Sequence, residues 1–155
     1  MAARTRKMRL HAMAHARSGD KGDGSNVGLI AYDDAGYEII RRQVTAARVR
    51  AHFRGVVKGR VDRYEVPNLR ALNFILHDSL GGGGSGSLKT DAQGKTHGMG
   101  LLLMEVTVPA SYAPAGAGAA GNEPPARGPV RLKATTVKAK RVKARSARSG
   151  KRARR

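Results

Sequence analysis

The sequence contains no cysteine and no tryptophan, and its aromatic residues are limited to four tyrosines and two phenylalanines. Without cysteine the chain can form no disulfide scaffold, no thiolate zinc site and no cysteine nucleophile. No apolar run approaches the ~18 residues that a membrane-spanning helix needs, so no membrane association is predicted. The first nine residues are basic and lack the apolar segment of a secretory signal. We therefore expect a cytoplasmic protein.

Acidic residues are also scarce, with 11 Asp and Glu against 30 Lys and Arg, which gives a formal net charge of +19. Residues 1–109 contain 17 basic and 10 acidic residues, a net of +7. Residues 110–155 contain 13 basic residues and a single acid, Glu123, a net of +12. Excess positive charge favours phosphate backbones, so composition alone indicates nucleic-acid binding. That prediction applies mainly to the C-terminal region.

Composition divides the chain into three parts. Residues 1–109 carry periodic Val, Ile, Leu and Phe and form the predicted folded domain, whose core is modest in size. Residues 110–129 are rich in Ala, Gly and Pro, which is typical of a flexible linker. Residues 130–155 contain only four bulky apolar residues, too few to offset the entropy of ordering, so a disordered basic tail is predicted. Because this tail has no aromatic residues to stack on bases, we expect it to contact nucleic-acid phosphates rather than read base sequence. The alternative is a solvated tail that binds no specific partner.

Hydrophobic periodicity predicts a mixed α+β fold. Strands are predicted at 8–17, 27–32, 61–66, 88–91 and 99–108, with a polar connection at 18–26. One helix is predicted within 37–53, where Thr45 can cap its second half. A second helix is predicted over 68–80. Asn68 can cap its N-terminus, and leucines at 69, 72, 76 and 80 form an apolar stripe along one face. The order indicates a small α+β sandwich with helices on one face of a mainly antiparallel sheet.

The segment 18–26, Ser-Gly-Asp-Lys-Gly-Asp-Gly-Ser-Asn, is the densest polar cluster. Its carboxylates, ammonium, hydroxyls and glycine N–H groups can form an anion-binding nest or bind a hard cation. It lacks the EF-hand spacing, and no metal site is predicted. Asp20 and Asp23 can in principle serve as acid and base. A simple strand connection is the alternative, although this segment takes nine residues where two suffice for a hairpin.

Two glycine motifs resemble nucleotide-binding loops only in part. Gly81-x-Gly83-x-x-Gly86 follows a predicted helix and precedes a predicted strand, the reverse of the dinucleotide-binding arrangement. Its bare backbone can let a ligand approach closely, and a mobile linker is the alternative. Gly94-Lys95-Thr96 resembles the end of a P-loop. However, Lys89 stands where the first glycine is required, so NTP hydrolysis is not predicted.

The five histidines do not form a metal-binding pattern. His11 and His15 lie on one predicted strand, where they would be about 13 Å apart and poor joint ligands. No His-x-x-x-His has a nearby Glu, which disfavours a zinc hydrolase. His97 is the strongest histidine candidate for chemistry because Lys95 and Asp91 are close to it in sequence.

Several blocks follow one another in a familiar order. They are ARSGDKGD (16–23), SNVGLIA (25–31), TAARVRAHF (45–53), RYEVPNLRALNF (63–74), GGGGSGSL (81–88) and DAQGKT (91–96). Over about residues 8–108 the chain resembles the AtuA-like ferredoxin-fold domain, which is the C-terminal part of acyclic terpene utilisation proteins or a separate short chain. The resemblance implies a ferredoxin-like two-layer α+β sandwich without an iron–sulfur cluster.

The resemblance also implies a metabolic role, because the family is associated with bacterial breakdown of acyclic terpenes and related branched acyl-CoA compounds. It implies a coenzyme A thioester as substrate, acyl-CoA hydration as a reaction and a larger AtuA-type chain as partner. The chain itself would be a non-catalytic or site-completing subunit of an acyl-CoA hydratase/lyase-type complex, and a homo-oligomer is left open. The alternatives are a nucleic-acid-associated protein acting through residues 130–155 and an assembly module without chemistry. No cofactor is expected.

The resemblance carries no assigned catalytic residues, so the polar residues of its blocks are the site candidates. The candidates for catalysis are Asp20, Lys21, Asp23, Lys95 and His97. The candidates for ligand binding are Arg17, Ser18, Ser25, Asn26, Gly82, Gly83, Gly84, Ser85, Asp91 and Gln93, with Asn68 and Asn73 in a further matching block. Among them, the cationic side chains of Arg17, Lys21 and Lys95 are expected to meet coenzyme A phosphates.

Overall fold

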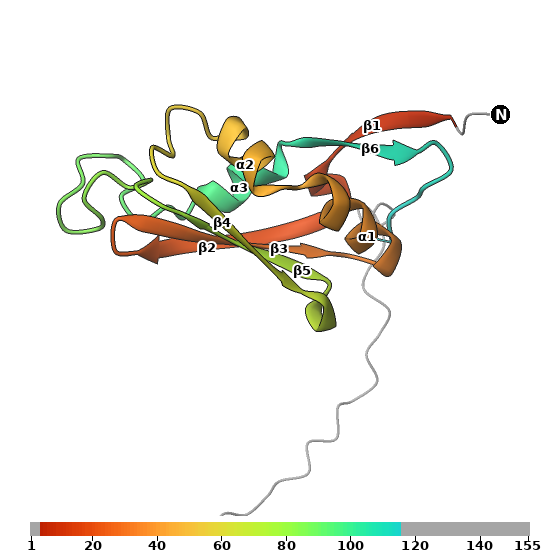
Figure 1. Ribbon diagram of the computed structural model, residues 1–155, viewed down its shortest axis with the longest axis horizontal. Helices are drawn as coiled ribbons and strands as arrows, with labels where there is room; N and C mark the ends of the chain where they lie inside the picture. Colours follow the sequence, from red (N-terminus) through yellow and green to blue (C-terminus); the bar gives the residue numbers. More distant parts are fainter. Residues whose placement is uncertain (1–3, 116–155) are drawn as a thin grey trace, which may run out of the picture. The chain divides into compact units, whose positions relative to one another are not determined.

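A four-stranded antiparallel sheet is the larger layer of the computed structural model, which describes residues 4–115 (Figure 1). Its strands are β2 (Ala14–Lys21), β3 (Gly24–Ala31), β4 (Val61–Val66) and β5 (Ala71–Leu76), in the order β2-β3-β5-β4. Every second residue of β3 and β5 is buried, so one face of the sheet forms the core. The predicted tail at 130–155 and most of the predicted linker lie outside the described residues.

A second sheet pairs the two ends of the described segment. β1 (Thr5–Arg9) and β6 (Glu105–Pro109) run antiparallel, with Met8 opposite Val106. Met8, Val106 and Val108 are buried in the same hydrophobic core as the inner face of the large sheet. Contacts continue past the predicted boundary at residue 109, because Tyr112 donates a hydrogen bond from its hydroxyl to Asp33 (3.2 Å).

Within residues 4–115, three helices lie on one side of the four-stranded sheet (Figure 1). α1 (Asp34–Gln43) begins at Asp33, whose carboxylate accepts a hydrogen bond from the backbone N–H of Gly36 (2.6 Å). α2 (Ala46–His52) begins at Thr45, whose hydroxyl accepts from the N–H of Arg48 (3.3 Å), as the sequence predicts. α3 is the short helix His97–Leu102. The predicted ferredoxin-like α+β sandwich is therefore confirmed. No helix among residues 4–115 is long and apolar enough to cross a membrane.

The predicted helix at 68–80 is wrong, because residues 71–76 form β5, a central strand of the sheet. Leucines at 72 and 76 satisfy helical and strand spacing equally, and Phe74 between them makes the buried period two. Leu69 is 62% exposed and belongs to the 3-10 turn η2 (Pro67–Leu69). That turn closes the β4–β5 hairpin through Arg70, which adopts a left-handed conformation (φ 51°).

The predicted single strand at 8–17 is also wrong, because the 3-10 turn η1 (Leu10–Ala12) separates β1 from β2. His11 lies in that turn while His15 lies in β2, so the two histidines do not share a strand. β2 then continues to Lys21, and most of the predicted nine-residue connection is strand. The true turn is Gly22–Asp23, where Gly22 adopts a left-handed φ of 64°.

The C-terminal part of the domain differs from prediction in two places. Residues 88–91 form bends and turns rather than a strand. The predicted strand at 99–108 is divided between α3 and β6, because Leu101 belongs to a helix that packs on β2 whereas Val106 and Val108 alternate toward the core. His97 therefore stands at the start of a helix.

Candidate functional site

The β2–β3 hairpin separates the polar residues of 17–26 onto two faces of the sheet. Arg17 is opposite Gly28, Gly19 opposite Asn26 and Lys21 opposite Gly24. Because side chains alternate along a strand, these pairs occupy the outer face, away from the helices. Ser18, which is opposite Val27, and Ser25, which is opposite Asp20, point to the inner face, where both serines are buried. The predicted cluster thus forms two distinct groups.

The outer group, together with Ser18 and with Lys95 from the loop before α3, lines a surface pocket of about 330 Å³ at the β2 edge of the sheet. Its lining residues are Arg17, Ser18, Gly19, Lys21, Asn26, Gly28 and Lys95. Three of these carry a positive charge, and no carboxylate of the described residues lines the pocket. Guanidinium and ammonium groups are the side chains that proteins use to bind phosphate, so the charge of this pocket suits an anion.

The ammonium group of Lys95 lies beside Gly19 in the pocket. A Cβ built on Gly19 would lie 3.4 Å from the Nζ atom of Lys95. Lys21 is held by a hydrogen bond from its Nζ to the carbonyl of Asp20 (2.9 Å). The amide Nδ2 of Asn26 donates to Oδ1 of Asn73 on β5 (2.8 Å), which fixes its orientation. The neighbouring strand β5 therefore positions Asn26, and the backbone of β2 itself positions Lys21.

The backbone around Lys95 is held by Ser18 and Asp91. Ser18 Oγ donates to the carbonyl of Gly94 (2.6 Å) and accepts from the N–H of Gly98 (2.8 Å). Asp91 accepts hydrogen bonds from the N–H groups of Lys95 and Thr96, both at 2.8 Å, and from the Thr96 hydroxyl (2.6 Å). Burial alone would raise the pKa of Asp91, but these hydrogen bonds hold it below its usual value. Both side chains position Lys95 within the loop.

The inner group forms a buried chain of hydrogen bonds. Ser25 Oγ lies 2.7 Å from Nδ1 of His97 and 3.2 Å from Oγ of Ser79, and Ser79 donates to the carbonyl of Leu76 (2.9 Å). One direction satisfies all three contacts: His97 Nδ1–H donates to Ser25, Ser25 donates to Ser79, and Ser79 donates to the carbonyl. The neutral ring then carries its proton on Nδ1.

Burial lowers the pKa of His97; Asp91 opposes this shift and Lys89 adds to it. Ser25 is fully buried, so its hydroxyl meets His97 but is not open to a substrate. His97 is also absent from the lining of the pocket that contains Lys95. The structure thus separates the histidine candidate from the cationic candidates.

The glycine-rich loop packs on the β2–β3 turn. Asp23 accepts the N–H of Gly82 at its carboxylate (2.6 Å) and the N–H of Leu80 at its carbonyl (2.9 Å). Gly83 has a φ of 76°, and a Cβ there would lie 2.7 Å from the carbonyl oxygen of Gly22. Packing and backbone conformation are therefore sufficient to explain why glycine occupies this position, and no bound ligand is needed to explain it.

The remaining candidates are spread around the domain. A Cβ on Gly84 would lie 3.8 Å from Cγ of Gln93, Ser85 is exposed, and Asn68 lies in the β4–β5 turn. Asp20 shows no side-chain hydrogen bond to the described residues.

The sequence alone did not indicate Ser79, Gly19 or Gly28 as site residues. Period-two alternation along 14–21 could have shown that residues 17, 19 and 21 share a face, but nothing local indicates Ser79. No group of three or more His, Asp or Glu within residues 4–115 is arranged to hold a metal ion.

Comparison with known proteins agrees with the fold. The family model described as the AtuA ferredoxin-like domain matches residues 8–107. No curated protein and no solved structure matches the chain. The match covers most of the described residues and includes both the outer pocket and the buried serine–histidine chain. The chain belongs to the AtuA ferredoxin-like domain family.

Proposed function

We propose that this chain is a site-completing subunit in the breakdown of acyclic terpenes or related branched acyl-CoA compounds, and that its outer-face pocket holds the phosphates of a coenzyme A thioester. The observation that carries the proposal is the convergence of Arg17, Lys21 and Lys95 on one pocket that no described carboxylate lines. Coenzyme A carries a diphosphate and a ribose phosphate, so three clustered cations match its charge. An arginine guanidinium can bind a phosphate through two parallel hydrogen bonds.

The size of the pocket supports a subunit role. At about 330 Å³ it lies at the lower end of small-molecule sites. It can receive a phosphorylated end of the ligand, whereas a whole coenzyme A thioester is larger. The acyl group must then lie on another surface, and we assign that surface to a larger AtuA-type chain.

The chemistry of the pocket points in the same direction. Neither an imidazole nor a carboxylate of the described residues lines it, so this chain supplies charge and position there. Acyl-CoA hydration needs a group that transfers a proton to or from water or the α-carbon. In this proposal that group comes from the partner chain, and no cofactor is required.

The outer face offers a surface for such a partner. Arg17, Gly28, Asn73 and Tyr64 pair in one row across the four strands. The side chain of Tyr64 is 53% exposed on the same face as the pocket. Exposed tyrosines are frequent energetic centres of protein interfaces. A partner covering this row would close over the pocket.

Titration with coenzyme A tests the proposal. We expect Arg17→Gln/Lys95→Gln to weaken binding by about tenfold or more, because charge-assisted hydrogen bonds are lost. The matched control is Arg54→Gln/Lys58→Gln, which removes the same charge from exposed positions outside the pocket. Equal weakening by both variants would show a net-charge effect and would refute the pocket.

A further inference from the structure

A long stretch of the folded domain lacks acidic residues. Between Glu38 and Asp62 the sequence contains seven Lys and Arg and no Asp or Glu. The stretch includes the end of α1, all of α2 and the connection to β4. This basic segment belongs to the folded body and is separate from residues 130–155.

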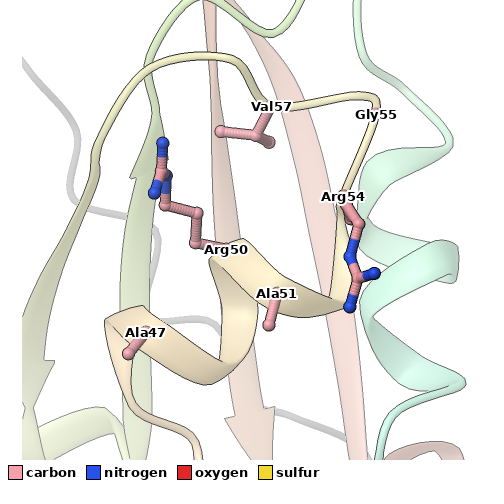
Figure 2. Close-up of a pocket in the computed structure, with 6 residues that line it drawn as sticks. All are labelled: Ala47, Arg50, Ala51, Arg54, Gly55 and Val57. Carbon is pink, nitrogen blue, oxygen red and sulfur yellow. The ribbon is translucent and has the colours of Figure 1, made fainter.

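Two hollows adjoin along α2. The first, of about 420 Å³, is lined by Ala47, Arg50, Ala51, Arg54, Gly55 and Val57. Figure 2 shows Arg50 and Arg54 extending on opposite sides of this hollow, with Ala51 on the helix between them and Ala47 one turn before Arg50. The second, also about 420 Å³, shares Ala47 and Arg50 and extends to Arg60. Together they form a groove with a floor of small residues and with arginines at its borders.

Two arginines of α2, one of which lines this groove, are oriented by backbone carbonyls. Arg50 donates from Nε to the carbonyl of Gly59 (3.0 Å). Arg48 donates to the carbonyls of Gln43 (2.8 Å) and Glu105 (2.6 Å). A carbonyl partner fixes the guanidinium but leaves its net charge uncompensated. Less side-chain entropy is then lost when an anion binds.

Two further cations have no partner within the part of the chain that the structure describes. The side chains of Arg54 and Lys58 are exposed and make no hydrogen bond or ion pair with residues 4–115. They border the same region as Arg50, because the first hollow includes Arg54 and because Arg50 also approaches the carbonyl of Lys58 (3.5 Å).

Two carboxylates near the ends of this segment have basic partners. Asp62 pairs with Arg60 (3.0 Å) and His77 (2.7 Å), and Glu38 pairs with Arg41 (2.8 Å). These acids therefore offset charges at the ends of the segment, while Arg48, Arg50, Arg54 and Lys58 remain uncompensated by a paired carboxylate. We call these four residues and Arg60 the α2 basic surface.

We propose that the α2 basic surface binds the phosphate backbone of single-stranded nucleic acid. Its cations are mainly arginines, which match phosphate geometry, and its alanine floor lets a sugar–phosphate chain approach the helix. The two hollows have no aromatic lining residue, so the contact is with phosphates and independent of base sequence. The same chain carries 13 basic residues after residue 109, which add to its net positive charge and so to its long-range attraction for a polyanion.

The experiment measures binding of the full chain to a labelled oligo-dT of about 20 nucleotides across a salt series. To isolate the folded body, the 12 Lys and Arg after Val130 are replaced by Gln in a chain of full length. In that background Arg54→Gln/Lys58→Gln is compared with Arg17→Gln/Lys95→Gln. Arg50 is left in place because it holds the loop before β4.

We expect the tail-neutral chain to bind the oligonucleotide at low salt. Arg54→Gln/Lys58→Gln should reduce the slope of log affinity against log salt by about 1.4, the value for two lost phosphate contacts on a single strand. Arg17→Gln/Lys95→Gln should change it by less than half as much.

Three results would overturn the proposal: no binding by the tail-neutral chain, equal effects of the two variants, or binding to phosphatidylglycerol vesicles in place of the oligonucleotide. Coenzyme A titration of the same variants reads out the outer pocket separately. Failure of either proposal can therefore be distinguished from failure of the other.

Discussion

The hydroxyl oxygen of Ser25 on β3 lies 2.7 Å from Nδ1 of His97 at the start of α3, and 72 residues separate the two along the chain. This contact joins the inner face of the sheet to the helix whose preceding turn carries Lys95. Gly94 packs against both residues, because a Cβ there would lie 2.9 Å from Ser25 Cβ and 3.2 Å from His97 Nδ1. The buried contact thus supports the exposed pocket from behind.

Removing the Ser25 hydroxyl should destabilise the domain. Ser25→Ala leaves Nδ1 of His97 without its buried partner, and we expect a loss of about 1–3 kcal/mol in the free energy of unfolding. Urea denaturation measures the change. Ser85→Ala is the matched control because Ser85 is exposed, and it should alter stability by less than about 0.5 kcal/mol. Equal stability of the two variants would contradict the buried chain.

Stability should depend on pH through His97. Burial lowers the pKa of His97 below its usual 6.5, so the unfolded chain binds this proton at a higher pH than the folded chain. The contribution of His97 is fully present above pH 6.5 and is lost as pH falls through that value toward the folded-state pKa. Denaturation between about pH 7.5 and pH 5.5 should show this decline.

His97→Gln should flatten the decline, whereas His11→Gln, at an exposed position, should leave it unchanged. A slope that persists in His97→Gln would assign the effect to other groups.

Two glycines with similar backbone angles should differ in their tolerance of alanine. Gly22 has φ 64° with no atom within 4 Å of a built Cβ, and Gly94 has φ 62° with three heavy atoms at 2.9–3.2 Å. Gly22→Ala should cost only the ~1–2 kcal/mol of the left-handed conformation. Gly94→Ala adds overpacking of about 1–3 kcal/mol and should also weaken coenzyme A binding by displacing Lys95. Thermal denaturation and titration measure both effects, and equal costs would argue against the packing.

Tyr64 should matter for the partner chain. If a larger AtuA-type chain covers the outer face, Tyr64→Asp should reduce its recovery with the tagged full chain from the native host. Leu88→Asp is the control, because Leu88 is fully exposed and lies in a loop away from the strand row of Tyr64. Recovery unaffected by Tyr64→Asp would place the partner on another surface.

Local sequence was sufficient for elements whose pattern has one interpretation. The alternation of 61–66 before Pro67 predicted β4 with its observed bounds, and Thr45 caps α2 as expected. The local pattern led to a wrong prediction for 68–80, because the leucine spacing there fits both the helical and the strand period. Pairing of β5 with β3 and β4 decides that segment, and such long-range pairing is not visible in a local window.

The outer pocket could be predicted only in part. Once β2 is known to continue through Lys21, period two places Arg17 and Lys21 on one face. Lys95 joins them through contacts between distant segments, namely the hydrogen bond from Ser18 to the carbonyl of Gly94 and the close approach of Lys95 to Gly19. The position of His97 on the inner side of the sheet likewise depends on how α3 packs on β2, and spacing along the sequence does not show that packing.

The most direct test of the central claim is an amide NMR titration of the full chain with coenzyme A. We expect the largest shift changes at Gly19, Gly28 and Lys95, which line the pocket, and small changes at Ala47 and Ala51 on α2. Shift changes centred on α2, or none at the pocket, would contradict the claim.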